Sequence, residues 1–359
     1  QDYTVEGFST VTYEGTGAAQ YIGGTGFSPD FVWIKNRGRA QSHVLHDTVR
    51  GATGGEAYLL KSDSSNAETT FDGFGLTTFD ADGFTVIGNG GLTNLTGDTY
   101  VAWNWDMGGT TASNTSGSIT SSVRANTAYG QSIVSYSGTG SAATIGHGLA
   151  SAPTLIICKN RSASPKNWRT YHASLGNAQA VNLDTTAAVF SSTTSWNSTT
   201  PSTSVFSIGT ASTVNGSSNA QIAYCFHDVA NYSKFSSYEG TGGTHTITTG
   251  FAPAFVMIKN ADASGNWTMW DNTRNPNNPV TQLLRANTSG AEETKTDREP
   301  SFLSTGFSIG DADADTNASG QTYIYAAFAD TREYAYWYDQ SGNNNDWTSE
   351  GGLTESDVM

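Results

Sequence analysis

Residues 13–36 read YEGTGAAQYIGGTGFSPDFVWIKN, and two further stretches of the chain have a closely similar sequence. Residues 136–160 read YSGTGSAATIGHGLASAPTLIICKN, and residues 238–260 read YEGTGGTHTITTGFAPAFVMIKN. Each stretch opens with Tyr-x-Gly-Thr-Gly and ends in four apolar residues followed by Lys-Asn. A period of over about 100 residues is a whole small domain, because solenoid units repeat every roughly 20–50 residues. The sequence therefore predicts three tandem copies of one domain.

The composition favours a β protein with many tight turns. Only 14% of the 359 residues are charged, against about 25% in typical domains, and there are 40 glycines. Within each copy, short apolar runs recur every 8–12 residues or so with turn signals between them, which is typical of an antiparallel sandwich. We therefore expect an all-β chain of three tandem antiparallel β-sandwich repeats of jelly-roll type.

The domain boundaries follow from the three copies. We expect repeat 1 over residues 1–107, including a lead-in strand, repeat 2 over 132–230 and repeat 3 over 231–330. Residues 108–131 are rich in Gly, Ser and Thr, which predicts a flexible linker or a long edge excursion. The short joint between repeats 2 and 3 predicts a rigid contact there and a looser repeat 1. Residues 331–359 carry a dense aromatic strand and an Asn-rich turn, which either packs across repeat 3 or opens a further domain.

The charge balance argues against two classes of partner. The net charge is −15 with only 17 Lys and Arg, so the surface repels phosphate backbones and anionic lipids. The sequence also holds no apolar run of about 18 residues. We expect neither nucleic-acid binding nor membrane insertion.

One loop has the spacing of a calcium site. Asp311, Asp313, Asp315 and Asn317 place oxygen ligands at alternate positions, as at the start of a calcium loop. The Gly and the distal Glu of the EF-hand pattern are missing, and the matching loops of the other copies lack the acids. Calcium is thus the one cofactor that the pattern suggests, and a solvated turn is the alternative.

Aromatic residues are the best candidates for ligand contact. Trp168, Trp196 and Trp267 flank polar Ser/Asn loops, whereas most of the other tryptophans lie in apolar runs. Exposed aromatic faces with polar rims stack on sugar rings. We therefore expect these three to be the glycan-contacting residues, with core filling as the alternative.

The other polar motifs have structural explanations. Asp47 with Arg50 and Asp271 with Arg274 lie three residues apart, a spacing that suits a local ion pair, and the middle copy has His172-Ala-Ser-Leu instead. No second carboxylate, G-x-S-x-G elbow or phosphate loop accompanies them, so we expect no catalytic residues and no enzyme. For the recurring Lys-Asn, we expect Asn to start a turn and Lys to guard a strand edge.

The two cysteines, Cys158 and Cys225, both lie in the middle copy. Unpaired Cys behaves as a small hydrophobe, which favours two core residues, and a single disulfide within the domain is the alternative.

The blocks GFSPDFVWIKNR, HDTVRG, LTTFDADGFTVIG and DTYVAWNWD resemble a repeat of predicted structural proteins in tailed phages, marine and cyanobacterial phages above all. The segment YWYDQSGNNNDW is similar to a strand-turn motif of concanavalin A-like lectin and laminin-G-like sandwiches. The resemblance implies that the chain is the front part of a longer polypeptide. It supplies no catalytic residues.

These observations together predict a non-enzymatic structural or adhesion protein on the virion surface of a phage: a tail fibre, a spike or a capsid decoration. We expect its partners to be other virion proteins or copies of itself in a homo-oligomer, together with host surface glycans reached through loops. The alternative is a secreted or cell-surface carbohydrate-binding adhesin of a bacterium.

Overall fold

The computed structural model describes residues 7–53, 56–296, 300–310 and 312–330. These residues form 29 β-strands, one 3-10 turn, η1 (Ala173–Leu175), and one short helix, α1 (Ser212–Asn215). Every pairing between named strands is antiparallel. The expectation of an all-β, antiparallel chain is confirmed. The aromatic segment at 331–359 lies outside the described residues.

Repeat 1 consists of a large sheet, a small sheet and a short third sheet. The large sheet has the order β1 (Phe8–Glu14), β10 (Thr99–Trp105), β3 (Phe31–Asn36), β4 (Val44–Asp47). The small sheet has the order β2 (Gln20–Gly23), β9 (Gly83–Ile87), β8 (Gly75–Asp80). The third has the order β5 (Ala52–Thr53), β6 (Glu56–Leu59), β7 (Thr69–Asp72).

Repeat 2 has an eight-stranded large sheet and a two-stranded small one. The large sheet runs β11 (Ala112–Asn114), β12 (Ser121–Asn126), β13 (Gln131–Ser137), β20 (Ala220–Phe226), β15 (Leu155–Asn160), β16 (Arg169–His172), β17 (Gln179–Asn182), β18 (Phe190–Ser191). The small sheet pairs β14 (Ala143–Gly146) with β19 (Val205–Ile208).

Repeat 3 has a six-stranded large sheet and a three-stranded small one. The large sheet runs β21 (Ser233–Glu239), β29 (Thr322–Phe328), β23 (Phe255–Asn260), β24 (Trp267–Asp271), β25 (Gln282–Arg285), β26 (Glu293–Thr294). The small sheet runs β22 (His245–Thr248), β28 (Gly306–Ile309), β27 (Pro300–Leu303).

The centre of each large sheet is built in the same way. The strand that ends in Lys-Asn pairs with the closing strand of its repeat, and their registers agree: Phe31 faces Trp105, Leu155 faces Phe226, and Phe255 faces Phe328. These pairings make residues of the three repeats equivalent position by position.

The segment at 108–131 is not a flexible linker. It contains β11 and β12, and β12 pairs with β13, so the segment extends the edge of the repeat 2 sheet, as the alternative expectation of an edge excursion had it. Arg124 on β12 also forms an ion pair of 2.7 Å with Asp30 of repeat 1. The segment therefore ties the two repeats together.

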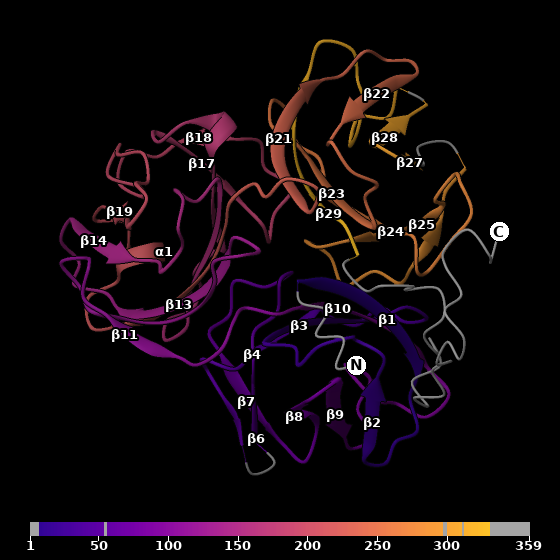
Figure 1. Ribbon diagram of the computed structural model, residues 1–359, viewed down its shortest axis with the longest axis horizontal. Coiled ribbons are helices and arrows are strands. Elements are labelled where there is room, and N and C mark those ends of the chain that lie inside the picture. Colours follow the sequence, from indigo (N-terminus) through magenta and orange to yellow (C-terminus); the bar gives the residue numbers. More distant parts are fainter. Residues whose placement is uncertain (1–6, 54–55, 297–299, 311, 331–359) are drawn as a thin grey trace.

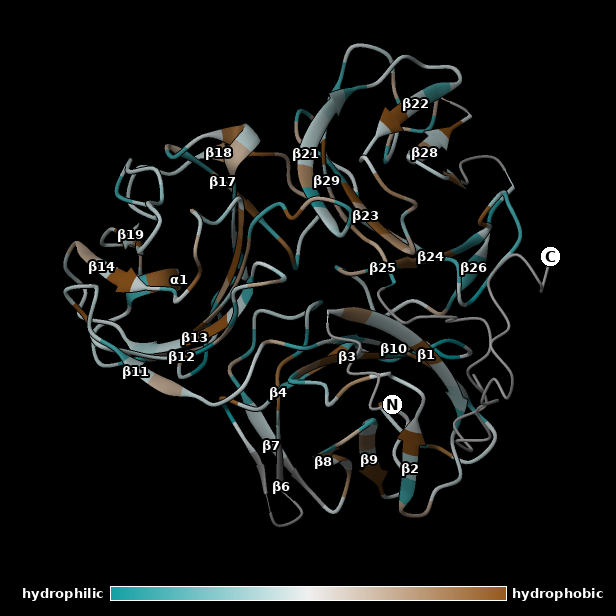
Figure 2. Cartoon of the chain, in the orientation of Figure 1, coloured by the Kyte–Doolittle hydropathy of each residue, from teal (hydrophilic) through white to brown (hydrophobic). Residues whose placement is uncertain are grey.

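Each repeat encloses an apolar cluster of its own between its large and small sheets. In repeat 1, for example, Val32 and Ile34 of β3 and Tyr100 of β10 pack against Ile22 and Phe84 of the small sheet. Repeats 2 and 3 have matching clusters. Figure 2 shows apolar residues on the large-sheet strands and on small-sheet strands such as β9.

The opposite faces of the large sheets pack against one another in a single shared cluster. Phe31 contacts Tyr224 with ring centroids 4.3 Å apart, and Trp105 lies 5.6 Å from Phe328 and 6.5 Å from Phe226. This cluster holds 30 buried residues drawn from all three repeats. The central strands are therefore buried on both faces, which explains why they read as continuous apolar runs and not as an alternation.

The three repeats surround this shared cluster, with their large sheets toward the middle (Figure 1). The expectation that repeat 1 is looser than the other two is wrong. Repeat 1 contributes Phe8, Phe31, Trp103 and Trp105 to the common interior. The reason is that the second apolar face of each sheet must be removed from water, and only the other repeats can cover it.

A small cavity of about 20 Å³ lies within the shared cluster and is lined by apolar residues of all three repeats, including Ala326. Ala326 is the equivalent of Trp103 and Tyr224, so repeat 3 fills less of the centre than its partners do. A space of this size holds about one water molecule, and its apolar lining gives water no hydrogen-bond partner.

Truncating the shared cluster should destabilise the whole chain at once. We expect Trp105→Ala to lower the free energy of unfolding by about 3–5 kcal/mol, because it deletes a buried indole that contacts repeats 2 and 3. Differential scanning calorimetry should show one transition, shifted as a unit, for the variant and the parent protein.

The matched control is Phe84→Ala, which empties the interior of repeat 1 alone. Separate transitions, of which Trp105→Ala moves only one, would show that the repeats fold independently and would contradict the shared interior.

Candidate functional site

The tryptophans expected to contact sugars are all buried. Trp168 is 0% exposed, and Trp196 and Trp267 are each 2% exposed. Trp196 lies in the interior of repeat 2, with its ring 5.7 Å from that of Tyr171. The expectation of exposed stacking faces is wrong for all three, because Trp168 and Trp267 lie in the cluster shared by the repeats and Trp196 lies in the interior of repeat 2.

Two of these tryptophans join neighbouring repeats. The indole N–H of Trp168 donates to the Lys61 carbonyl of repeat 1 at 2.8 Å, and that of Trp267 donates to the Asn182 carbonyl of repeat 2 at 2.9 Å. His43 is the equivalent residue of repeat 1. Burial lowers the pKa of His43 well below its usual value, and the backbone of Arg285 in repeat 3 acts in the opposite direction. The same position thus faces the next repeat at each of the three interfaces.

The expected calcium ligands close a loop instead. Asp313 accepts the Asp315 N–H at 2.8 Å, and Asp315 accepts the N–H of Asn266 at 2.8 Å. Asn317 accepts the Thr241 N–H at 2.9 Å. Asp311 lies outside the described residues.

The equivalents of Asn317 show that this is a feature of every repeat. Asn94 accepts the Thr16 N–H, and Asn215 accepts the Thr139 N–H, in the same position after Tyr-x-Gly. Across the described part of the chain, no group of three or more His, Cys, Asp or Glu could hold a metal ion. Of the expected ligands, Asn317 caps the Gly-Thr-Gly loop, and Asp313 and Asp315 accept other backbone N–H groups. Calcium binding by the full set, which includes Asp311, stays a prediction.

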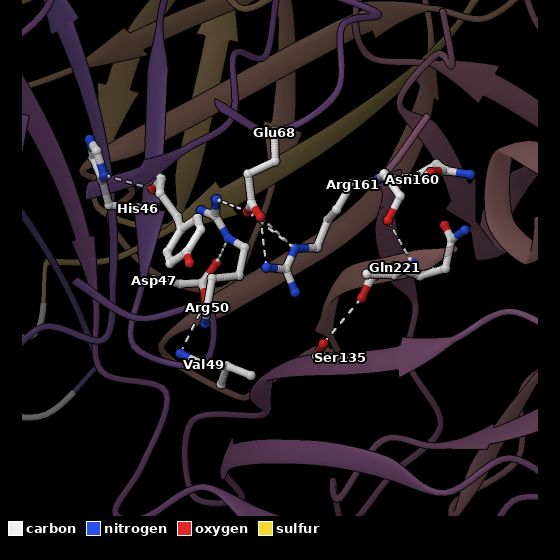
Figure 3. A network of polar contacts seen from close by, with 12 residues as sticks. His46, Asp47, Val49, Arg50, Glu68, Ser135, Asn160, Arg161 and Gln221 are labelled. Atoms are coloured by element: carbon white, nitrogen blue, oxygen red, sulfur yellow. Dashed lines mark hydrogen bonds and ion pairs between the residues drawn. The ribbon is translucent and has the colours of Figure 1, made fainter. Parts of the chain in front are cut away.

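The most distinctive polar feature is a buried charge network between repeats 1 and 2 (Figure 3). Asp47 pairs with Arg50, as the spacing predicts, and neither side chain is exposed. Arg50 also pairs with Glu68 at 3.0 Å, and Glu68 in turn receives both arms of Arg161 from repeat 2. Tyr224 of repeat 2 donates to Asp47 at 2.7 Å. The Asp47–Arg50 pair of repeat 1 is thus part of a larger network that includes Arg161 and Tyr224 of repeat 2.

The same network recurs between repeats 3 and 1. Arg274 pairs with Asp271 at 2.6 Å and with Glu292 at 2.9 Å, and Glu292 receives both arms of Arg37 from repeat 1. Trp103 takes the place of Tyr224 and donates to Asp271 at 3.0 Å. Repeat 1 therefore contacts repeat 3 in the same way that repeat 2 contacts repeat 1. Together with the contact between repeats 2 and 3, this closes a ring.

The third interface, between repeats 2 and 3, has the same backbone geometry but lacks the charged residues of the network. The backbone bond that Glu68 N–H makes to Arg161 O, at 2.9 Å, recurs at 2.9 Å between Val189 and Ala261. His172 and Leu175 stand where the other repeats have Asp and Arg. Every charged member is therefore replaced by an uncharged one on both sides of this interface together.

Burial sets the ionisation states in these networks. Burial lowers the pKa of His172 to about 4 and that of His46 to about 3, so both are neutral at pH 7. Burial also lowers the pKa of Arg274, but Asp271 and Glu292 outweigh it and leave that pKa raised. Burial raises the pKa of Glu292, but hydrogen bonds from Arg37 and the charge of Arg274 leave it below its usual value. Arg274 and Glu292 thus stay ionised and compensate one another.

The three lysines of the Lys-Asn pairs are buried, which corrects the expectation that they guard strand edges. Lys35, Lys159 and Lys259 are each 0% exposed, and burial lowers the pKa of each to about 8. Lys159 donates to the Ser64 carbonyl of repeat 1 at 3.4 Å, and Lys259 to the Thr186 carbonyl of repeat 2 at 3.3 Å. Lys159 and Lys259 thus bind backbone carbonyls across the interfaces, whereas Lys35 donates to the Asn36 and Arg39 carbonyls of its own repeat.

The asparagines that follow them do start turns, as expected. The Asn160 side chain accepts the N–H groups of Ser162 and Ala163, and Asn260 does the same for Asp262 and Ala263. Cys158 and Cys225 are buried free thiols, so the expectation of core residues holds and the disulfide alternative does not.

Comparison with known proteins identifies the chain at the level of its family. A family described as a domain of unknown function (DUF7483) matches residues 4–332, and the chain belongs to it. No curated protein and no solved structure matches the chain. The family match spans all three repeats, in agreement with one folding unit around a common interior. Within the described residues, no helix is long and apolar enough to cross a membrane.

Exchanging one network for the uncharged set tests what the charges contribute. Glu68→Val alone should cost about 3–5 kcal/mol of unfolding free energy, because it removes the carboxylate that the buried Arg50 and the partly buried Arg161 share. Adding Asp47→His, Arg50→Leu and Arg161→Ala should recover most of that loss, because the third interface already uses these residue types. Urea denaturation measures both; a fourfold variant less stable than Glu68→Val would refute the equivalence.

The buried lysines predict a pH dependence. Because the folded-state pKa of Lys259 is about 8 and the unfolded value is 10.5, the unfolded chain binds more protons between these values. Stability from this group therefore rises with pH across that window, by up to about 1.4 kcal/mol per pH unit. Urea denaturation at pH 7.5 and 9.5 should show a smaller gain for Lys259→Met than for the parent; parallel pH profiles would contradict it.

Proposed function

We propose that the protein is a non-enzymatic structural or adhesion protein of a phage virion surface: a tail fibre, a spike or a capsid decoration. The observation that carries this proposal is the closed ring of three repeats around one apolar interior. Such an arrangement gives a rigid part of fixed shape, because no repeat can move without exposing the shared cluster. The resemblance of its repeat blocks to tailed-phage structural proteins supports the same conclusion.

We infer further that the chain consists of three tandem β-sandwich repeats of jelly-roll type. The recurrence of one strand order in the three large sheets, each opposed by a small sheet, supports this division. In this proposal the modules were joined in one chain and fused through their second apolar faces. Each sandwich is then the element that was repeated, and the complete ring of three is the unit that folds cooperatively.

The buried polar groups support a structural role over a catalytic one. The carboxylates of Asp47 and Glu68 are occupied by guanidinium groups and by Tyr224, and those of Asp271 and Glu292 are bound in the same way. These groups hold repeats together. Contacts with host glycans would then fall to exposed loops, since the candidate tryptophans are buried.

The location of the chain tests this proposal. We expect mass spectrometry and cryo-EM of purified phage particles that encode the chain to find it on the particle exterior, and a glycan array with the isolated protein to show weak binding that multivalent display strengthens. A chain absent from the particles and found on the surface of bacterial cells would overturn the phage assignment and leave the bacterial adhesin.

A further inference from the structure

Two cations of repeat 2, Lys166 and Arg169, direct their side chains away from the interfaces. Residues 159–169 carry four of the 17 Lys and Arg of this acidic chain. Lys159 and Arg161 bind repeat 1, as described above. Lys166 and Arg169 turn instead toward helix α1.

These two cations contact consecutive hydroxyl residues. The Lys166 ammonium donates to the Ser212 hydroxyl at 2.9 Å, in an exposed position, and Arg169 Nη2 donates to the Thr213 hydroxyl at 3.4 Å. The guanidinium group of Arg169 also stacks on Phe190, 4.6 Å from the ring centroid. Two cations therefore contact two neighbouring hydroxyl groups on helix α1, and all four side chains can donate hydrogen bonds.

The charge of Arg169 is not neutralised within the described part of the chain. Its Nε and Nη1 atoms are buried and have no hydrogen-bond partner there, and neither Arg169 nor Lys166 forms an ion pair. Asp184 is the nearby acid, but its oxygens accept from the Trp168 N–H and from Asn167. Guanidinium N–H groups without an acceptor favour an incoming anion.

The fold does not need a cation at this position. The equivalent residues are Val44 in repeat 1 and Thr268 in repeat 3, and both are buried. Arg169 is therefore a feature of repeat 2 alone, together with Lys166 and helix α1.

We propose that Lys166, Arg169, Ser212 and Thr213 form a binding site for a single small oxyanion group, a carboxylate or a sulfate. The planar guanidinium offers paired donors to such a group, and the ammonium and hydroxyls supply the remaining bonds. The anion enters at the exposed Lys166–Ser212 side.

The net charge of −15 limits the ligand. Extended polyanions meet repulsion over the rest of the surface, whereas one oxyanion group on an otherwise neutral molecule does not. On the proposed function, on which this step rests, the group is the acid of a sugar residue in a host glycan. A free inorganic anion shares the same chemistry.

Isothermal titration of the full chain tests the site, with sodium glucuronate, sodium sulfate and glucose as probes at constant ionic strength. We expect glucuronate and sulfate to bind, and Arg169→Thr to weaken both at least about tenfold, because a charge-assisted pair is lost. Threonine is the residue of repeat 3 at this position, so the variant should keep the fold, which near-ultraviolet circular dichroism checks. Lys234→Met, which removes a cation paired with Asp228 elsewhere on repeat 3, should bind like the parent.

Equal binding by Arg169→Thr and the parent would overturn the site, as would the absence of binding by both anions. Binding of glucose as tight as that of glucuronate would also overturn it, because the charge would then not be recognised. Sulfate binding that depends on Arg169, with no glycan bound on an array, supports the oxyanion site and removes the glycan contact from the proposed function. The two proposals can therefore fail separately.

Discussion

The structure depends on one constraint: the large sheet of each repeat is apolar on both faces and must be covered twice. The small sheet of the same repeat covers one face, and the other repeats cover the second. A sandwich with a solvated outer face would show alternation along β3, but Phe31 to Ile34 are all buried there. The ring is the consequence, because three such faces can be removed from water only by meeting one another.

The polar groups at the interfaces are secondary to this packing and give it order. Two interfaces carry buried ion networks and the third carries none, although the backbone bond beneath them is the same. Ion networks of this kind contribute less to stability than their number suggests, because desolvation offsets the attraction. These networks make two interfaces unlike the third, where Val189 stands in the place of Glu68 and Glu292.

The sequence was sufficient for the all-β class and for the Asp47–Arg50 and Asp271–Arg274 pairs, because these depend on local pattern and spacing. It was not sufficient for Glu68 and Arg161, which are distant in sequence and share no motif, so only the folded ring brings them together. The burial of Trp168 and of Lys159 was missed for the same reason: polar neighbours indicate exposure only if no other repeat covers them. The run of four apolar residues was the available signal of burial on both faces, and it was interpreted as one sandwich core.

The seams between repeats also have a direction. One edge of each repeat presents a carbonyl and, in repeats 1 and 3, a carboxylate. The opposite edge presents His43, Trp168 or Trp267, and the two indole N–H groups donate across the interface. If such head-to-tail contacts joined separate molecules, they would produce an open filament, unless the rotation between neighbours brought the last molecule back to the first. In the part of the chain that the structure describes, the third repeat meets the first, so each of these edges already faces a neighbouring repeat and cannot recruit another molecule into a filament. Growth of any larger assembly must therefore use surfaces other than these seams.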